Sequence, residues 1–226
     1  MKTYELLVFD WDGTLMDSEH RIVTCMQLAA ADTGQPVPED AAARNIIGLG
    51  MREAVSTLFP QLEAAQVNGI IDAYREHWLD EQIPASSLFP GAQAVLRSLS
   101  NAGYLLAVAT GKSRRGLDKV LDETGLGELF HMTRCADEAY SKPHPQMLED
   151  ILTDLDTSPA NALVIGDTEY DMQMAANARV DAVGVVHGVH SRERLLAHGA
   201  LTVLDHLNEL TLWLGSNART NLEVGT

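Results

Sequence analysis

Three carboxylates lie close together near the start of the chain, in the stretch VFDWDGTLMDSEH at residues 8–20. Asp10 and Asp12 directly follow a short apolar run, and Asp17 comes five positions later. Alternate side chains of an extended segment point to the same side, so the first two acids can act together. Because like charges repel at short range, such a pair requires a cation. Asp17 instead fits the hinge at the start of a following helix, beside its predicted N-cap Ser18, where an acid favours the helix dipole.

Polar residues also follow two later apolar runs. Thr110 and Gly111 end one run, and Asp167 ends another, with Asp171 four residues on. Lys142 lies in the loop SKPHP before the second of these runs. Ligands of open parallel sheets bind at the carboxyl ends of the strands, so we expect these groups to converge. Carboxylate ligands without nearby His or Cys favour Mg²⁺.

The remaining polar groups suit a phosphate. The Thr110 hydroxyl can donate a hydrogen bond, and Gly111 lets the backbone approach closely before a helix whose N–H groups point at an anion. Lys142 supplies a positive charge. A site that holds Mg²⁺, a phosphate and a free carboxylate has the parts for phosphoryl transfer through an aspartyl-phosphate.

The elements that position these residues alternate along the chain. Short apolar runs predict strands at residues 6–9, 104–110, 162–167, 182–186 and 201–204, with a weaker candidate at 130–135. Helical spacing of apolar residues lies between several of them, at 91–103, 113–125 and 145–155. This alternation predicts an α/β fold, a Rossmann-like three-layer core with a parallel sheet between helices.

One segment breaks this alternation. Residues 18–87 contain several helical patterns and no convincing strand, which indicates an inserted helical domain. We predict a discontinuous core domain at 1–16 and 88–226 and a small helical domain at 17–87. The polar residues 216–226 are predicted to be a flexible tail.

Composition narrows the function classes. The chain of 226 residues is 46 % apolar and has a formal net charge of −16. Such acidity argues against nucleic acid as a partner, and no polybasic or long apolar segment indicates a membrane. The two distant cysteines fit a reduced, cytoplasmic protein, and no signal peptide is visible. The sequence does not indicate an oligomeric state.

The four groups of residues, taken in order, resemble the signature motifs of the haloacid dehalogenase-like (HAD) superfamily. They are DWDGT at 10–14, Thr110, Lys142 and GDTEYD at 166–171. The resemblance implies that Asp10 is the nucleophile and that Asp12 is the general acid and base. Thr110 and Lys142 would hold the phosphate.

The resemblance also implies a metal site and its ligands. The Asp10 side chain, the Asp12 backbone carbonyl and Asp167 would bind Mg²⁺. Asp171 would support the metal from outside its ligand shell.

Motif spacing resembles one branch of this family. The first motif is separated from the second by 100 residues (110 − 10), and the second from Lys142 by only 32 (142 − 110). The insertion after the first motif resembles the α-helical cap of the phosphoglycolate phosphatase and β-phosphoglucomutase branch. Arg52 would lie in the loop through which that cap reads the substrate, although a plain surface role is equally open. Trp11 replaces a commoner aliphatic residue and is expected to contact the cap.

Three functions remain open from the sequence. The first is a Mg²⁺-dependent phosphatase acting on a small phosphorylated metabolite, phosphoglycolate-like or a sugar phosphate. The second is a sugar-phosphate mutase like β-phosphoglucomutase, which shares all four motifs. The third is a regulatory module such as a receiver domain, although a receiver is about half this length and lacks the insertion. Lys112, near the expected phosphate site, is expected to be solvated more often than to bind substrate.

Overall fold

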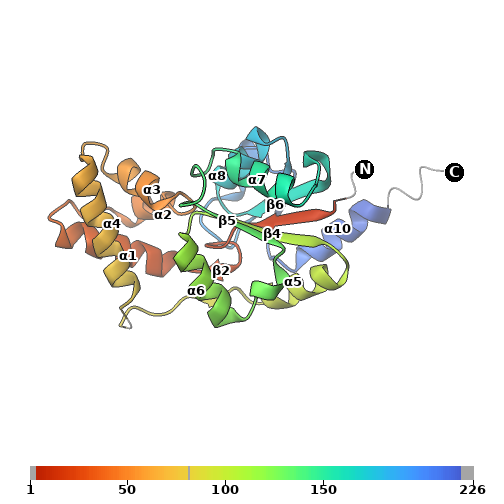
Figure 1. The fold of residues 1–226 in the computed structure, drawn as a ribbon, viewed down its shortest axis with the longest axis horizontal. Helices are drawn as coiled ribbons and strands as arrows, with labels where there is room; N and C mark the ends of the chain where they lie inside the picture. Colours follow the sequence, from red (N-terminus) through yellow and green to blue (C-terminus); the bar gives the residue numbers. More distant parts are fainter. Residues whose placement is uncertain (1–3, 81, 220–226) are drawn as a thin grey trace.

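The computed structural model describes residues 4–80 and 82–219. Six parallel strands form one sheet in the order β5-β4-β1-β6-β7-β8 (Figure 1). The strands are β1 (Leu6–Phe9), β4 (Leu105–Thr110), β5 (Met132–Cys135), β6 (Ala162–Gly166), β7 (Asp181–Val185) and β8 (Val203–Leu204). β1 lies in the middle of the sheet and pairs with β4 and β6. All six lie where the apolar runs predict strands.

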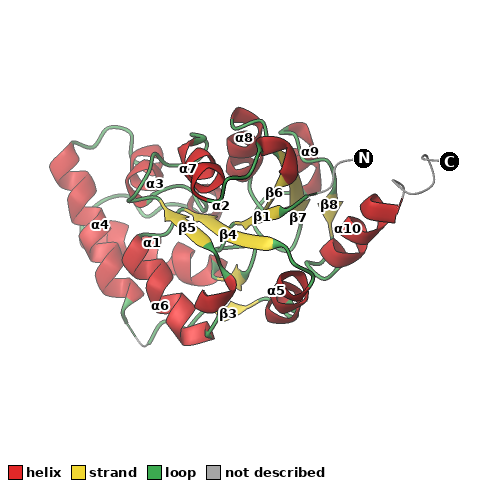
Figure 2. Cartoon of the chain, turned by 45° about the vertical axis from the view of Figure 1, so that its right-hand side comes forward, coloured by secondary structure: helices red, strands yellow, loops and turns green. Residues whose placement is uncertain are grey.

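Helices cover both faces of this sheet, as Figure 2 shows. One face is covered by α5 (Ala92–Asn101), α6 (Arg114–Thr124) and α10 (Glu209–Arg219), and the other by α7 (Gln146–Asp154), α8 (Glu169–Asn177) and α9 (Arg192–Ala197). Short 3₁₀ helices lie at Gly127–Leu129 and Pro159–Asn161. Alternate residues of β1 enter opposite cores: Leu7 and Phe9 pack on the α5 side, and Leu6 and Val8 on the α7 side. The predicted three-layer α/β class is therefore confirmed.

The segment between the first two motifs is helical, as predicted. Its helices are α1 (Glu19–Asp32), α2 (Asp40–Asn45), α3 (Met51–Leu58) and α4 (Ala64–Trp78). They enclose apolar clusters of their own, which include Met26, Val55 and Ile70. We call residues 17–87 the cap, and its standing as a separate domain remains a proposal.

Two short strands join the cap to the rest of the chain. β2 (Met16–Asp17) pairs antiparallel with β3 (Ser87–Leu88). Asp17 therefore lies at this junction, directly before the N-cap Ser18 of α1, as predicted. The expectation of no strand over residues 18–87 was wrong only at its last residue, Ser87, because a two-residue strand leaves no periodic signal in a sequence.

The flexible tail was predicted to begin at residue 216, which is too early, because the last helix continues past this residue. Residues 216–219 belong to α10, and residues 220–226 lie outside the described part of the chain. Leu210 and Leu214 bury one side of this helix against the core. Within residues 4–80 and 82–219, no helix has the length and apolar character needed to span a membrane.

Trp11 packs in the core and not against the cap, so that expectation was wrong. It is fully buried in the same cluster as Leu7 and Phe9, and its ring meets Phe130 edge-on at 6.2 Å between centroids. The alternation of β1 continues past the strand end, which sends residue 11 to the side opposite Asp10 and Asp12. The bulky ring thus anchors the backbone between the two acids.

We predict that Trp11→Ala lowers the free energy of unfolding by about 3 to 5 kcal/mol, because it removes a large buried side chain and leaves a cavity. Urea unfolding followed by circular dichroism measures this change. Leu212→Ala serves as the control, since that side chain is 76 % exposed. Equal effects of the two substitutions would contradict the core position of Trp11.

Candidate active site

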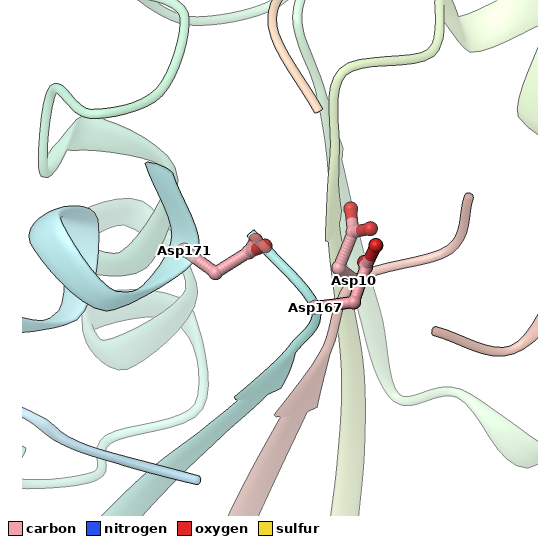
Figure 3. A group of neighbouring side chains, drawn as sticks. All are labelled: Asp10, Asp167 and Asp171. Atoms are coloured by element: carbon pink, nitrogen blue, oxygen red, sulfur yellow. The ribbon is translucent and has the colours of Figure 1, made fainter. Parts of the chain in front are cut away.

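The predicted residues meet at the carboxyl ends of three neighbouring strands. Thr110 is the last residue of β4, Asp10 follows β1, and Asp167 follows β6. The sheet order β4-β1-β6 places these ends side by side. Asp171 reaches the same point from the first turn of α8 (Figure 3). The sheet therefore brings together residues that lie more than 150 positions apart.

Lys142 lies at the centre of the charge arrangement. Its Nζ is 2.6 Å from Asp10 Oδ1 and 2.6 Å from Asp171 Oδ1, and its side chain is fully buried. Burial alone would lower the pKa of Lys142, but the charges of the two carboxylates outweigh burial and raise that pKa above its ordinary value. Lys142 is therefore a permanent cation in this site.

The three buried carboxylates outnumber this cation. Asp10, Asp167 and Asp171 can each offer an oxygen within 4.8 Å of the others. Burial raises the pKa of Asp10 well above its ordinary value; Lys142 opposes this rise, while Asp171 and Asp167 add to it. Burial and the charge of Asp171 also raise the pKa of Asp167 to about 7. The cluster thus holds more negative charge than the protein alone compensates.

A side-chain hydroxyl and a backbone N–H hold the Asp167 carboxylate. Its carboxylate accepts hydrogen bonds from Thr14 Oγ1 and the Val189 N–H, each at 2.9 Å. A Cβ at Gly13 or at Gly188 would clash with this carboxylate, and Gly13 also has φ of +88°. The two glycines are required because their backbones lie directly against the acid.

Asp171 is already occupied by protein donors. Its Oδ2 accepts from the N–H and the hydroxyl of Thr168, at 3.1 and 2.6 Å, while its Oδ1 accepts from Lys142. Thr168 and Asp171 form a reciprocal capping box at the start of α8. Both oxygens are therefore engaged, and Asp171 orients Lys142.

The cluster suits a hard divalent cation. Within the described chain, Asp10 Oδ2 is buried without a hydrogen-bond partner. An orphaned carboxylate oxygen beside a second carboxylate is costly unless a cation binds it. All the available donors are oxygens, as a divalent metal of this kind prefers. The assignment of Asp10, Asp167 and the Asp12 carbonyl as the ligands remains a proposal.

Asp12 has partners that the sequence did not suggest. Its Oδ1 accepts from Ser18 Oγ at 2.6 Å and from Lys112 Nζ at 2.8 Å. Ser18 occupies the predicted N-cap position of α1, but its side chain makes no cap hydrogen bond and turns to Asp12 instead. Lys112 was expected to be solvated, yet its side chain is only 9 % exposed. That expectation was wrong, because the ammonium is paired with a carboxylate.

The cap lies directly against the loop that follows β4. A Cβ at Gly111 would lie 2.5 Å from the Leu49 carbonyl oxygen and 2.7 Å from that of Gly48. Thr110 is buried, and its hydroxyl accepts from the Lys112 N–H at 3.1 Å. A cavity of about 430 Å³ lies between cap and core, with Asp12 in its wall.

The structure does not bring Arg52 to this cavity. Its Nη2 donates to Asn68 Oδ1 at 2.6 Å, between α3 and α4. Among the described residues that line the cavity, its neighbour Met51 is present and Arg52 is absent. The role of Arg52 as a substrate contact therefore remains a prediction without support from this geometry.

Comparison with known proteins agrees with this geometry. The family model described as haloacid dehalogenase-like hydrolase matches residues 7–185. The N-acetylmuramic acid 6-phosphate phosphatase of Pseudomonas putida is 29 % identical, over 90 % of this chain and 93 % of that protein. A phosphoglycolate phosphatase of Vibrio cholerae is also 29 % identical, over 85 % of this chain and 89 % of that protein.

A solved structure shares the fold. The crystal structure of a hydrolase from Pseudomonas syringae superposes with a TM-score of 0.85, is 23 % identical, and matches 95 % of this chain and 99 % of that one. The chain belongs to the haloacid dehalogenase-like hydrolases, as an enzyme of the phosphatase kind.

We predict that a divalent cation stabilises the protein more at high pH than at low pH. The raised pKa of Asp167, about 7, means that the metal-free folded state keeps a proton there below neutrality and loses stability as pH rises through that value. Binding a cation requires the ionised form, so affinity should fall roughly tenfold per pH unit below neutrality.

The thermal shift caused by Mg²⁺ at about pH 5.5 and at about pH 8 measures this dependence. Asp167→Asn is the control and should abolish the difference between the two shifts. A shift of equal size at both pH values would contradict the coupling.

Proposed function

We propose that this protein is a Mg²⁺-dependent phosphatase that hydrolyses a small phosphorylated metabolite through an aspartyl-phosphate. The observation that carries the proposal is the buried, unpartnered Oδ2 of Asp10, whose other oxygen is held by Lys142. Asp10 is thus a carboxylate that Lys142 holds through one oxygen and that has its other oxygen free. Such a group is suited to attack phosphorus.

The reaction proceeds in two displacements. The Asp10 carboxylate forms a bond to phosphorus while the bond from phosphorus to the leaving oxygen breaks, and Asp12, which enters this step protonated, gives that oxygen its proton. Asp12 then takes a proton from water, and the water oxygen attacks the aspartyl-phosphate to release phosphate and restore Asp10. Thr110 and Lys142 hold the phosphate oxygens during both steps.

A bound Mg²⁺ would neutralise the negative charge of the acids and of the transferring phosphate. The Asp10 and Asp167 side chains and the Asp12 carbonyl would hold it. The positions after β1 and β6 support this assignment, since both carboxylates approach from neighbouring strands.

The cavity supports a small organic phosphate as substrate. Its wall includes apolar cap side chains such as Ile47, Met51 and Trp78, next to Asp12 and Gly111. Its volume lies at the lower end of the range of small-molecule sites. Two relatives are named for phosphoglycolate and for a sugar phosphate, so both compounds are first choices for a substrate screen. A cytoplasmic location also remains a prediction.

We predict that Asp10→Asn lowers phosphate release from p-nitrophenyl phosphate by on the order of 10⁴-fold or more, because the amide cannot act as the nucleophile. Release of p-nitrophenolate, followed by absorbance, measures the rate. Asp17→Asn is the matched control, since it makes the same change at the exposed junction of cap and core. Wild-type rates in Asp10→Asn would overturn the proposed nucleophile.

We predict that a chelator abolishes turnover and that added Mg²⁺ restores it, because the excess negative charge repels the phosphate without a cation. Phosphate release before and after dialysis against the chelator provides the measurement. Full activity of the dialysed enzyme would contradict the metal requirement. Analysis of hexose 1-phosphate products would show isomer formation if the enzyme were a mutase.

A further inference from the structure

The ring of Trp78 lies at the boundary between cap and core, next to an ammonium group of the core. Trp78 is the last residue of α4, and Lys112 Nζ lies 4.6 Å from the centroid of its ring. A cation at this distance from an indole ring is attracted by the negative face of the ring. Both side chains line the cavity. The contact therefore joins a cap helix directly to the loop after β4.

The same ammonium holds the proposed acid and base. Lys112 Nζ is 2.8 Å from Asp12 Oδ1, and the two side chains are only 9 % and 10 % exposed. The Lys112 N–H donates to Thr110, which fixes the backbone from which the long side chain extends. Asp12 is thus held by one contact within its own segment, from Ser18, and by one from the loop after the neighbouring strand β4, from Lys112.

The position of Trp78 is fixed by a second cation. The Arg21 guanidinium lies 5.0 Å from the centroid of the same ring. It also donates to the carbonyls of Trp78 and Ile83, at 2.6 and 2.7 Å. The Trp78 carbonyl lies in the last residue of α4 and the Ile83 carbonyl lies beyond the helix, so neither has a helix N–H group of the described chain as a partner. Arg21 therefore ties the end of α4 to α1, so the position of Trp78 is fixed within the cap.

We propose that Trp78 and Lys112 are positioning residues that hold the Asp12 carboxylate in its working orientation, so that acid–base chemistry depends on the place of the cap. The inference rests on the proposed function, in which Asp12 protonates the leaving group. Without the aromatic face, the ammonium is free to adopt other rotamers of a flexible side chain. Asp12 then keeps only its bond to Ser18.

A comparison of two leaving groups tests this role. Phenol is a weaker acid than p-nitrophenol, so phenyl phosphate needs protonation of its leaving oxygen far more than p-nitrophenyl phosphate does. We expect Lys112→Met to lower kcat/KM for phenyl phosphate on the order of 10²-fold. Trp78→Leu should lower it roughly 3- to 30-fold, the range of a cation–π contact. Both losses should be much smaller for p-nitrophenyl phosphate.

Two controls separate positioning from a general loss of structure. Trp213→Leu removes a tryptophan that stacks on Tyr4 in the core, and Arg97→Met removes an exposed cation on α5. Neither control should change the ratio of the two kcat/KM values. Trp78→Phe keeps an aromatic face and should therefore lose less kcat/KM for phenyl phosphate than Trp78→Leu. This variant also tests the role of the ring if Trp78→Leu does not fold.

The outcomes distinguish this inference from the proposed function. Equal losses on both substrates, or no loss in Lys112→Met, overturn the positioning role. Asp12→Asn should still lower kcat/KM selectively for phenyl phosphate in that case. If Asp12→Asn hydrolyses both esters at the wild-type rate, the proposed acid is wrong, and the inference falls with it.

Discussion

The site is dominated by the cost of burying three carboxylates around a single ammonium. Asp10, Asp167 and Asp171 lie within reach of one common ion, and Lys142 can contact only two of them. Each buried charge must be compensated by a partner or by protonation. Protein donors satisfy Asp171, and backbone and hydroxyl groups partly satisfy Asp167. The uncompensated charge therefore remains at Asp10, where the proposed chemistry begins.

The surrounding fold is built to allow this concentration of charge. Parallel strands place three chain segments side by side at one edge of the sheet, where backbone N–H groups are available. Asp171 also lies in the first turn of α8, whose dipole favours a negative charge. The glycines on either side of Asp167 let two loops close over the acid. Buried side chains of the core, among them Trp11, pack next to these strand ends and fix their positions.

Sequence patterns predicted those features of the site that are determined by residues close to one another in the sequence. Apolar runs indicate the strands because a buried parallel strand is apolar on both faces. The residues after those runs indicate the site because strand ends converge. The burial of Lys112 could not be predicted in this way, since it depends on Trp78, which lies 34 positions earlier (112 − 78) on a helix of the cap. Ser18 illustrates a second limit: a hydroxyl suited to capping α1 bonds Asp12 instead.

The charges of the site bear on how an acidic chain can bind an anionic substrate. Three ionised carboxylates and one ammonium leave a net charge of −2, which repels a phosphate. On the proposed function a divalent cation brings this sum to zero, so the metal has to bind before the phosphate does. The second lysine is not directed at the phosphate, because its ammonium already donates to Asp12. Attraction for the substrate therefore arises from the geometry of individual donors and from the metal, and not from any excess of positive charge. Lys112 can orient Asp12 because its ammonium contacts both the Asp12 carboxyl group and the ring of Trp78, so its place depends on the cap.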